Sequence, residues 1–463
     1  CVYIWIFPMQ LIDLNRTKDI GSSCLFAKIG SFNILFDSGI SPKRSGYDAL
    51  PAFDKLGTTV IDLILISHCH LDHVGSLPYV MKRQQQARVL ITQASHILLP
   101  RILNNCVTVM QLQRDEQGIK EYPLYALADI EALEQHILPM QFGKSRILRK
   151  DNDEITITFF EAGHVVGASS ILVEHKHRGI FYTGDVLFRD LKILRGAKWP
   201  IRKIDTVITE TTRGSTVRPK ERSADSETER LVGTIRDTIS RGGSVLIPAF
   251  AFGRMQEILK IIGCARQKNK LQQTTPIFCS GLGYGLIEDF DFISKKLSGV
   301  NFRKRIVKEL KIKIFRGNNP NDIKKQIQEP SIFVLSSGML VENTSAYNVA
   351  SAIIDDHKSA ICFVGFCDES TPGGELQKYS PGDSFLFKAQ NYVTKIAAKI
   401  DKFDISGHAD REEILKNILT MSPRAVVLVH GEEDSRNWFM DELIELSPGI
   451  QVFDMNPCKE FLI

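Results

Sequence analysis

The chain has 463 residues, 43% of them hydrophobic and 24% charged, which fits a globular protein and excludes a disordered or membrane-spanning one. Because this length exceeds what one ordinary hydrophobic core needs, two domains are expected. The net charge of +4 allows a polyanionic substrate without requiring one.

The cysteines and the first residues bear on the cellular compartment. Nine cysteines are scattered singly without a C-x-x-C pair, which is typical of a reducing, cytoplasmic location. We find no segment that resembles a transmembrane helix and predict no membrane association. We interpret residues 1–8 as an upstream extension, because the recognisable domain starts near Met9.

The first sixty residues show short apolar runs broken by Gly, Ser and Asn, which is the pattern of β-strands. The run 33–36 ends on Asp37, next to a serine and a glycine. Two interpretations of Asp37 stay open: a turn-forming residue, or an acceptor that orients a metal-binding histidine.

A stretch around residue 70 carries a dense group of metal-binding side chains. Its spacing, H-x-H-x-D-H, comprises His68, His70, Asp72 and His73. Such nitrogen and oxygen donors suit zinc and similar metals. In an extended segment His68 and His70 share one side, and a following helix directs Asp72 and His73 elsewhere. One short segment can therefore serve two metal ions, and Cys69 should point away from them.

Helices and further strands follow in chain order. Helices are expected at 77–82, 95–113 and 126–133. Strands are expected at 154–160, 179–184 and 205–209. His164 lies soon after the first of these strands, and Asp185 and Glu210 end the other two.

Between about 213 and 390 short strands alternate with helices, which is typical of a doubly wound parallel α/β domain. The strands are expected at 244–248, 277–278, 331–335 and 360–364. After this insert the chain carries Ser406, His408 and an apolar run that ends on His430. We therefore place the first domain at 9–212 and 391–463 and the insert at 213–390.

Six polar residues have the same position relative to a predicted strand: each follows the carboxyl end of an apolar run. They are Asp37, His68, His164, Asp185, Glu210 and His430. In layered α/β folds the loops that carry active sites leave the sheet at that edge. We expect these residues to meet at one site.

In this order the residues resemble the metallo-β-lactamase superfamily, and specifically its β-CASP branch of nucleic-acid nucleases. The resemblance covers residues 9–463, and the stretches 248–257 and 336–339 are also similar to the branch. The branch-specific positions match Glu210, His408 and His430. The resemblance implies an αββα sandwich with an inserted doubly wound parallel α/β domain.

The resemblance also implies a zinc-dependent ribonuclease of RNA processing or decay. It would hydrolyse phosphodiester bonds with a hydroxide activated by two zinc ions, with manganese as an alternative. One ion would bind His68, His70 and His164, the other Asp72, His73 and His430, and Asp185 would bridge them. The residues expected to take part in catalysis are His408 as proton donor, Glu210 as its partner, Asp72, Asp185 and Asp37.

The substrate implied by the resemblance is single-stranded RNA, because the last motif position, His430, is His in RNA enzymes of the branch and Val in DNA-repair enzymes. Backbone amides at Ser336, Ser337 and Gly338 could cradle a phosphate or simply form a turn. Arg254 could reach the RNA backbone or be an ordinary surface arginine. Ser406, next to the proposed proton donor, is a further candidate contact. The basic stretches 189–203 and 295–316 fit either RNA or a solvated face.

Three other functions deserve comparison: a DNA nuclease of the same branch, a small-molecule hydrolase such as a thioesterase or lactamase, and an inactive scaffold. The long insert disfavours a small substrate, and the complete set of seven metal ligands disfavours an inactive protein. Internal or 5′-to-3′ cleavage, the RNA target and the oligomeric state, a homodimer included, stay open.

Overall fold

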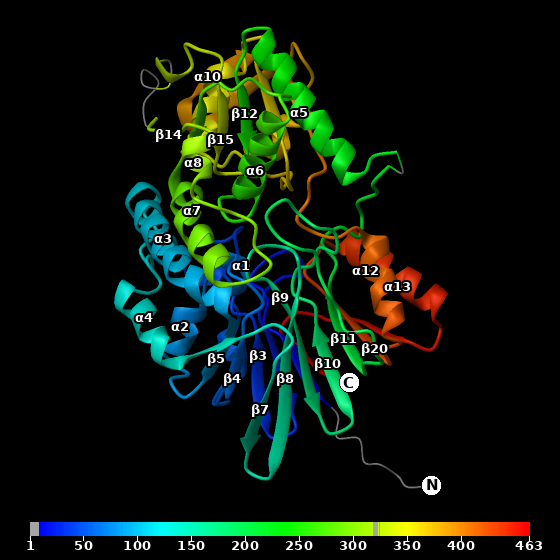
Figure 1. Ribbon diagram of the computed structural model, residues 1–463. Helices are drawn as coiled ribbons and strands as arrows, with labels where there is room; N and C mark the ends of the chain where they lie inside the picture. The colour runs from blue at the N-terminus through cyan, green and yellow to red at the C-terminus, as the bar shows by residue number, and fades with distance from the viewer. Residues whose placement is uncertain (1–8, 220, 318–322, 324) are drawn as a thin grey trace. The chain divides into compact units, whose positions relative to one another are not determined.

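The computed structural model describes residues 9–219, 221–317, 323 and 325–463, so the proposed extension at 1–8 lies outside the described residues. The chain forms two compact units (Figure 1). The first contains the chain up to Asp190, Gly196–Val217 and His408–Ile463. The second contains Leu191–Arg195 and Arg218–Gly407.

Two seven-stranded sheets form the first unit, with the orders β22-β1-β2-β3-β4-β5-β6 and β21-β20-β11-β10-β9-β8-β7. The first sheet consists of β1 (Gln10–Asp13), β2 (Leu25–Ile29), β3 (Phe32–Phe36), β4 (Leu63–Leu65), β5 (Arg88–Thr92), β6 (Ile137–Met140) and β22 (Glu460–Leu462). The second consists of β7 (Ser145–Lys150), β8 (Asp153–Glu161), β9 (Ser169–His175), β10 (Arg178–Tyr182), β11 (Thr206–Glu210), β20 (Ala425–Val429) and β21 (Gln451–Asp454).

Successive side chains along each strand point to alternate faces of the sheet, and this divides the core of the unit into layers. In β20, Val427 belongs to the cluster between the two sheets, together with Ile34 and Leu65 of the first sheet. Its neighbours Val426 and Leu428 instead pack with buried residues of two helices. Successive side chains of a strand point to opposite faces, so an entirely apolar strand such as β20 can be covered on both sides.

Helices flank the two sheets on their outer sides (Figure 1). Beside the first sheet lie α1 (Leu71–Val74), α2 (Leu77–Met81), α3 (Gln93–Gln117) and α4 (Leu127–Glu131). Beside the second lie α12 (Arg411–Thr420) and α13 (Glu433–Leu446). The unit is thus the predicted αββα sandwich. The helix expected at 126–133 is α4 followed by a short 3₁₀ turn, Ala132–His136.

The second unit contains a six-stranded sheet of order β14-β13-β15-β12-β16-β19, in which all neighbours are parallel. Its strands are β12 (Val245–Pro248), β13 (Ile277–Cys279), β14 (Ile312–Ile314), β15 (Ile332–Leu335), β16 (Ala360–Phe363) and β19 (Lys399–Lys402). Its helices include α5 (Ala224–Ser240), α6 (Arg254–Gln267), α7 (Gly281–Lys296), α8 (Ile306–Glu309), α10 (Ser345–Ile353) and α11 (Pro372–Leu376). Two further strands, β17 (Ser384–Phe387) and β18 (Tyr392–Lys395), form a hairpin. The parallel α/β architecture agrees with the sequence expectation.

The end of the second unit differs from the sequence-based boundary. The sequence placed the return to the first domain at residue 391, whereas the structure places it at His408. The physical reason is strand pairing, because β19 adds to the sheet of the second unit by parallel pairing with β16.

Parallel pairing brings the strand ends of the first unit together. β3 pairs in parallel with β4, and β11 pairs in parallel with both β10 and β20. Residues that directly follow these strands therefore leave the sheets at the same edge. Among the described residues, each helix is too short or too polar to cross a lipid bilayer.

Candidate metal centre and catalytic residues

The H-x-H-x-D-H stretch has the two-part geometry that its sequence predicts. After the buried strand β4 the chain stays extended as far as His70, which has φ −66° and ψ 148°, and α1 begins at Leu71. His68 and His70 thus project from extended backbone, whereas Asp72 and His73 project from a helix. Cys69 points away from them, with its Sγ donating to the carbonyl of Ser95 at 3.3 Å.

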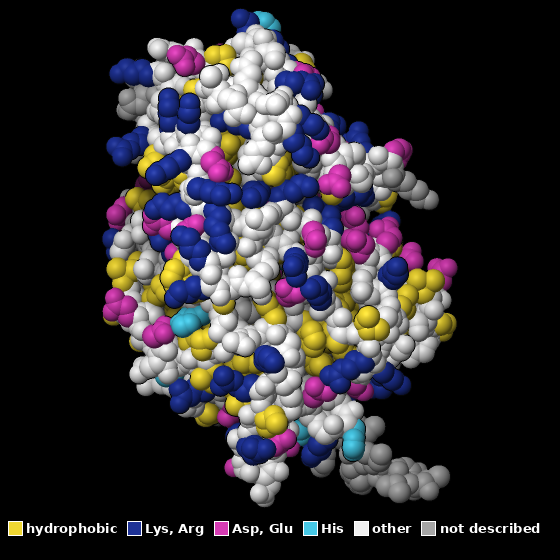
Figure 2. All heavy atoms as spheres, in the orientation of Figure 1, with side chains coloured by type: hydrophobic (Ala, Val, Ile, Leu, Met, Phe, Trp, Pro, Cys, Tyr) yellow, Lys and Arg dark blue, Asp and Glu magenta, His cyan; other side chains and the backbone are white. Residues whose placement is uncertain are grey.

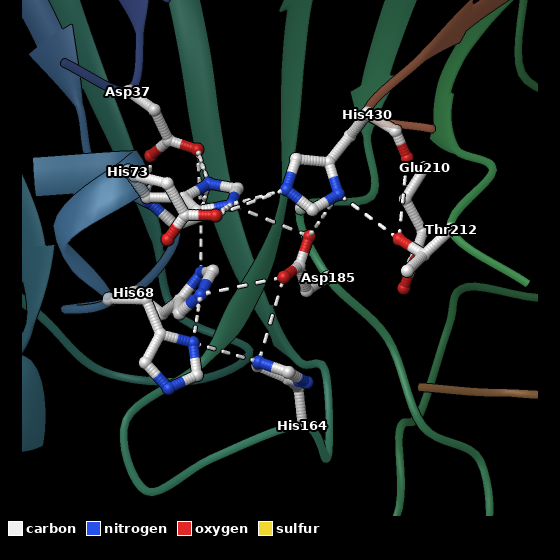
Figure 3. Close-up of polar contacts among 12 residues, drawn as sticks. Asp37, His68, His73, His164, Asp185, Glu210, Thr212 and His430 are labelled. Atoms are coloured by element: carbon white, nitrogen blue, oxygen red, sulfur yellow. Dashed lines mark hydrogen bonds and ion pairs between the residues drawn. The ribbon is translucent and has the colours of Figure 1, made fainter. Parts of the chain in front are cut away.

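A first cluster joins His68, His70, His164 and Asp185, whose donor atoms lie within 4.8 Å of one another. The Nδ1 atom of His70 lies 3.1 Å from Nε2 of His68 and 3.1 Å from Nε2 of His164. Oδ2 of Asp185 lies 3.7 Å from Nε2 of His68 and 3.6 Å from Nε2 of His164 (Figure 3).

A second cluster joins Asp72, His73 and His430. Nε2 of His430 lies 3.3 Å from Nε2 of His73 and 3.3 Å from Oδ2 of Asp72. The other carboxylate oxygen of Asp185, Oδ1, lies 3.5 Å from Nε2 of His73 and 3.4 Å from Nδ1 of His430. Asp185 therefore faces both clusters, one oxygen to each (Figure 3).

The chemistry of this donor set fits a bound metal. Oδ1 of Asp185 is buried and accepts no hydrogen bond from the described residues. Burial and the neighbouring imidazoles lower the pKa of His68 well below its usual value, which favours the neutral form that binds metals. Burial also lowers the pKa of His73, but Asp185, Asp72 and Asp37 outweigh it and raise that pKa to about 10. The carboxylates thus attract positive charge to the place where the imidazole nitrogens converge.

Asp37 lies behind this centre and contacts His73. It follows β3, is fully buried and has a φ of 61°. Its Oδ2 lies 2.7 Å from Nδ1 of His73 and accepts hydrogen bonds of 2.7 Å from the hydroxyls of Ser67 and Tyr182. Of the two interpretations of Asp37, this geometry favours the acceptor that orients a histidine, because Nδ1 is engaged and Nε2 faces the cluster.

His430 is held on its opposite side by Thr212. The hydroxyl of Thr212 lies 3.1 Å from Nδ1 of His430, and the same hydroxyl lies 3.3 Å from the carbonyl of His430. Thr212, Ser67 and Tyr182 are not among the residues predicted from the sequence. Their only sequence signal is closeness to a motif residue, because Thr212 follows Glu210 by two positions and Ser67 precedes His68.

Glu210 and His408 form a pair beside Asp185. Glu210 is 1% exposed, and its carboxylate lies 2.9 Å from Nδ1 of His408 and accepts the amide of Val186 at 2.6 Å. Nε2 of His408 lies 4.0 Å from Oδ2 of Asp185. Burial lowers the pKa of His408, but the charge and hydrogen bond of Glu210 outweigh it, so the pKa is raised. The pair can hold a proton near the candidate metal centre at neutral pH.

The five residues predicted to contact substrate belong to the second unit. Two amides, those of Met339 and Val341, donate to Oγ of Ser337, and a Cβ at Gly338 would lie 3.0 Å from the amide nitrogen of Phe250. The segment Ser336–Gly338 is therefore a closely packed turn after β15. Its role in substrate binding stays a prediction.

Of the two interpretations of Arg254, RNA contact or ordinary surface arginine, the structure contradicts the second. Arg254 is the first residue of α6 and is 6% exposed, and its Nη1 donates to the carbonyl of Ile405 at 3.0 Å. The amphipathic pattern of α6 could not reveal this, because the acceptor lies 151 residues away. Arg254 thus holds the segment that contains Ser406, which is half-buried.

Lys and Arg side chains gather on the second unit over α7, α8 and β14 (Figure 2). The stretch 295–316 contains nine of them against Glu309, and all nine are exposed. Some are neutralised locally, as in the pairs Lys304–Glu288 and Arg305–Glu309. Both interpretations of this stretch, RNA contact and solvated face, stay open.

Three family models match the chain. They are described as a metallo-beta-lactamase superfamily domain at 26–217, a Beta-Casp domain at 255–376 and a Zn-dependent metallo-hydrolase RNA specificity domain at 393–453. Six of the seven proposed metal ligands lie within the first match, and the seventh, His430, lies within the third.

Individual proteins are also similar. Cleavage and polyadenylation specificity factor 73 of Drosophila melanogaster is 28% identical over 438 residues, which cover 92% of this chain and 60% of that protein. A probable RNase of Methanocaldococcus jannaschii, MJ4, is 26% identical over 440 residues, covering 94% of this chain and 96% of that protein. The chain thus spans less than two thirds of the Drosophila relative.

A solved structure shares the fold. The crystal structure of a protein of unknown function from Enterococcus faecalis superimposes with a TM-score of 0.56 and 11% sequence identity, covering 98% of this chain and 100% of that chain. At this identity the similarity concerns the fold alone.

Proposed function

The chain belongs to the β-CASP branch of the metallo-β-lactamase superfamily, and we propose that it is a metal-dependent ribonuclease. The observation that carries this proposal is the conjunction of two metal-binding clusters, shared by Asp185, with a buried Glu210–His408 pair. The match to an RNA specificity domain and the name of the archaeal relative support RNA as the substrate. They do not favour the alternatives of a DNA nuclease or a small-molecule hydrolase.

We assign two metal ions to these residues. Zinc is the expected metal, and manganese is the alternative. His68, His70 and His164 would hold one, Asp72, His73 and His430 the other, and Asp185 would contact both. When bound, the metals supply Lewis acidity that polarises the scissile phosphate and lowers the pKa of water. Asp37 supports this arrangement by keeping Nε2 of His73 directed at the centre.

His408 is the proposed proton donor to the leaving oxygen. Hydrolysis that breaks the bond between phosphorus and O3′ requires a proton on O3′, and the products are a 3′-hydroxyl and a 5′-phosphate. Glu210 engages Nδ1 of His408 and leaves Nε2 on the side of Asp185. An imidazole paired with a buried carboxylate retains its proton to higher pH, so His408 can serve as an acid near pH 7.

The proposed substrate is single-stranded RNA, and residues of the second unit are proposed to make further contacts with it. Ser336, Ser337, Gly338 and Ser406 are the assigned positions, with Arg254 acting through the segment that it holds. The eight described cysteines are all free thiols, which supports a reducing, cytoplasmic compartment. A homodimer stays an untested expectation.

The proposal is tested by cleavage of a 5′-labelled single-stranded RNA, with matched DNA as the competing substrate. Release of labelled mononucleotide would identify a 5′-to-3′ exonuclease, and a ladder of longer labelled fragments would identify an endonuclease. Protein that binds two metals and cleaves neither polymer would contradict the nuclease assignment.

His408→Ala is the matched variant in this assay. We expect its kcat to fall by about 10²–10⁴-fold, because general acid catalysis contributes this much. Metal content, measured by elemental analysis, should stay unchanged, because His408 is not among the assigned ligands. A variant with wild-type kcat would exclude His408 as the proton donor.

A further inference from the structure

A buried arginine supports the loop that carries His430. Arg436 lies in the first turn of α13, is 3% exposed and donates through Nη1 to the carbonyls of Gly431 and Lys18. We propose that Arg436 is a positioning residue for His430 and thereby sets the metal affinity of the Asp72–His73–His430 cluster. This inference rests on the dinuclear centre of the proposed function.

The guanidinium is itself fixed by charge. Its Nε lies 2.9 Å from Oδ1 of Asp454, and the other oxygen of Asp454 binds Nζ of Lys18 at 2.8 Å. The planar guanidinium forms an ion pair with the carboxylate while its Nη1 donates to two carbonyls, a combination that a lysine ammonium does not reproduce. Arg436 therefore ties the loop after β20 to β21 and to the N-terminal segment around Lys18.

The backbone at His430 needs such support. His430 has a φ of 51°, a left-handed conformation that costs free energy for a residue with a Cβ. On one side Thr211 closes the loop, because its amide donates to the carbonyl of His430 at 3.1 Å and a Cβ at Gly431 would lie 2.2 Å from its Oγ1. On the other side the carbonyl of Gly431 is held by Arg436.

Charged side chains lie beside this loop. A cavity borders His430 and Arg436, and its further lining includes Asp13, Lys18 and Asp454. Polar side chains therefore lie beside the loop on this wall, and the hydrogen bond from Arg436 is one of the contacts that hold it. Loss of the Arg436 contact should therefore let His430 move while the β20 strand stays in place.

The test is a metal titration of the wild-type protein, Arg436→Met and Arg436→Lys with Co²⁺ or Zn²⁺, with occupancy followed by absorption and by competition with a chelator. We expect Arg436→Met to weaken one of two binding steps by about 10-fold or more and to leave the other unchanged, because partners of metal ligands affect affinity at this scale. The affinity of Arg436→Lys in the weakened step should lie between that of the wild type and that of Arg436→Met. Saturating metal should restore the activity of both variants.

The matched control is Arg424→Met. Arg424 precedes β20 at the end opposite His430 and binds Asp205 at 3.2 Å and Gln451 at 2.9 Å. Its substitution should leave both binding steps unchanged. If Arg436→Met does not fold, Asp454→Asn is used in its place. This substitution keeps the guanidinium of Arg436 and removes the negative charge that fixes it. We expect a smaller loss of metal affinity in the same binding step.

Three outcomes would overturn the inference. Folded Arg436 variants with two wild-type binding steps would show that the loop holds itself. An equal loss in both steps would indicate general damage to the first unit. A wild-type protein that binds fewer than two metals would instead contradict the proposed centre, and this inference with it.

Discussion

Asp185 shows how one carboxylate can face two metal-binding clusters. Its two oxygens face different clusters, Oδ2 toward His68 and His164 and Oδ1 toward His73 and His430. The side chain is 3% exposed, so water cannot compensate for its charge, and the surrounding imidazoles or a bound cation must do so. The same principle applies to Glu210, whose buried charge is compensated by His408.

Asp13 provides a prediction about pH at the residue scale. It ends β1 in the neighbourhood of Arg436, Lys18 and Asp454. Burial raises the pKa of Asp13 to about 7, and Asp454 acts in the same direction, against the amide of Asn15, Arg436 and Lys18. Between about pH 4 and 7 the folded protein retains a proton that the unfolded chain has released, so the free energy of unfolding falls as the pH rises through this window.

Asp13→Asn should remove this contribution, because an amide does not ionise. Relative to the wild type, we expect its free energy of unfolding to rise by on the order of 1–3 kcal/mol between pH 5 and pH 8. Urea unfolding of both proteins at fixed metal concentration measures this difference. A difference that is the same at both pH values would contradict the raised pKa.

At the scale of elements, helix α3 supports the loop that carries His164. The hydroxyl of Thr92, at the N-cap of α3, accepts the amide of Ser95 at 3.1 Å and donates to the carbonyl of Gly167 at 2.7 Å. Oγ of Ser95 donates to the same carbonyl at 3.0 Å. Gly167 has a φ of 87°, and a Cβ there would lie 2.4 Å from Oγ of Ser95, so the loop and the helix end fit only with glycine at this position.

Thr92→Val should therefore lower the free energy of unfolding by about 1–3 kcal/mol, because a cap and a buried hydrogen bond are lost together. Thr108→Val in the same helix is the matched control, since Thr108 is exposed and its hydroxyl donates to the carbonyl of Asn104 within α3. The control should change stability by less than about 0.5 kcal/mol. Equal effects of the two substitutions, measured by denaturant unfolding, would argue against a role of Thr92 in holding the loop.

At the scale of the whole molecule, metal binding and substrate binding are assigned to different units. All seven proposed ligands, together with His408 and Glu210, belong to the first unit. The second unit contains 30 Lys and Arg against 21 Asp and Glu, although the whole chain has a net charge of only +4. The positive charge is thus concentrated in the insert, as expected for a unit that contacts a polyanion.

This division predicts how metal removal affects unfolding. A ligand that binds only the folded state stabilises it by about 4 kcal/mol at a thousandfold excess over its Kd. Chelation with EDTA should therefore lower the melting temperature of the first unit and leave that of the second unchanged. Differential scanning calorimetry with and without EDTA, followed by addition of zinc, measures both transitions. Equal shifts of both would mean that the units unfold together, and no shift would contradict the metal centre.

The sequence predicted the fold class through its resemblance to the superfamily, and it proposed most of the candidate site residues from motifs and strand ends. Apolar periodicity shows where strands end, and Asp37, His68, Asp185, Glu210 and His430 were recognised because they occupy those ends. The parallel pair β3–β4 aligns the strand ends before Asp37 and His68 within the first sheet, and the pairs β10–β11 and β11–β20 align those of Asp185, Glu210 and His430 within the second. Local pattern was sufficient to locate the strand ends, because burial and the alternation of side chains along a strand are encoded within a few residues.

The partner that each side chain meets follows from the three-dimensional arrangement of the chain and not from the local sequence. His430 lies beside Asp72, 358 residues earlier, and Arg436 holds the carbonyl of Lys18, 418 residues earlier. The burial of Arg254 and the boundary at His408 likewise follow from long-range contacts, to Ile405 and to β16. Such contacts depend on sheet order and loop closure, which local periodicity does not contain. The candidate ligands could therefore be predicted from the sequence, whereas the residues that hold them in place could not.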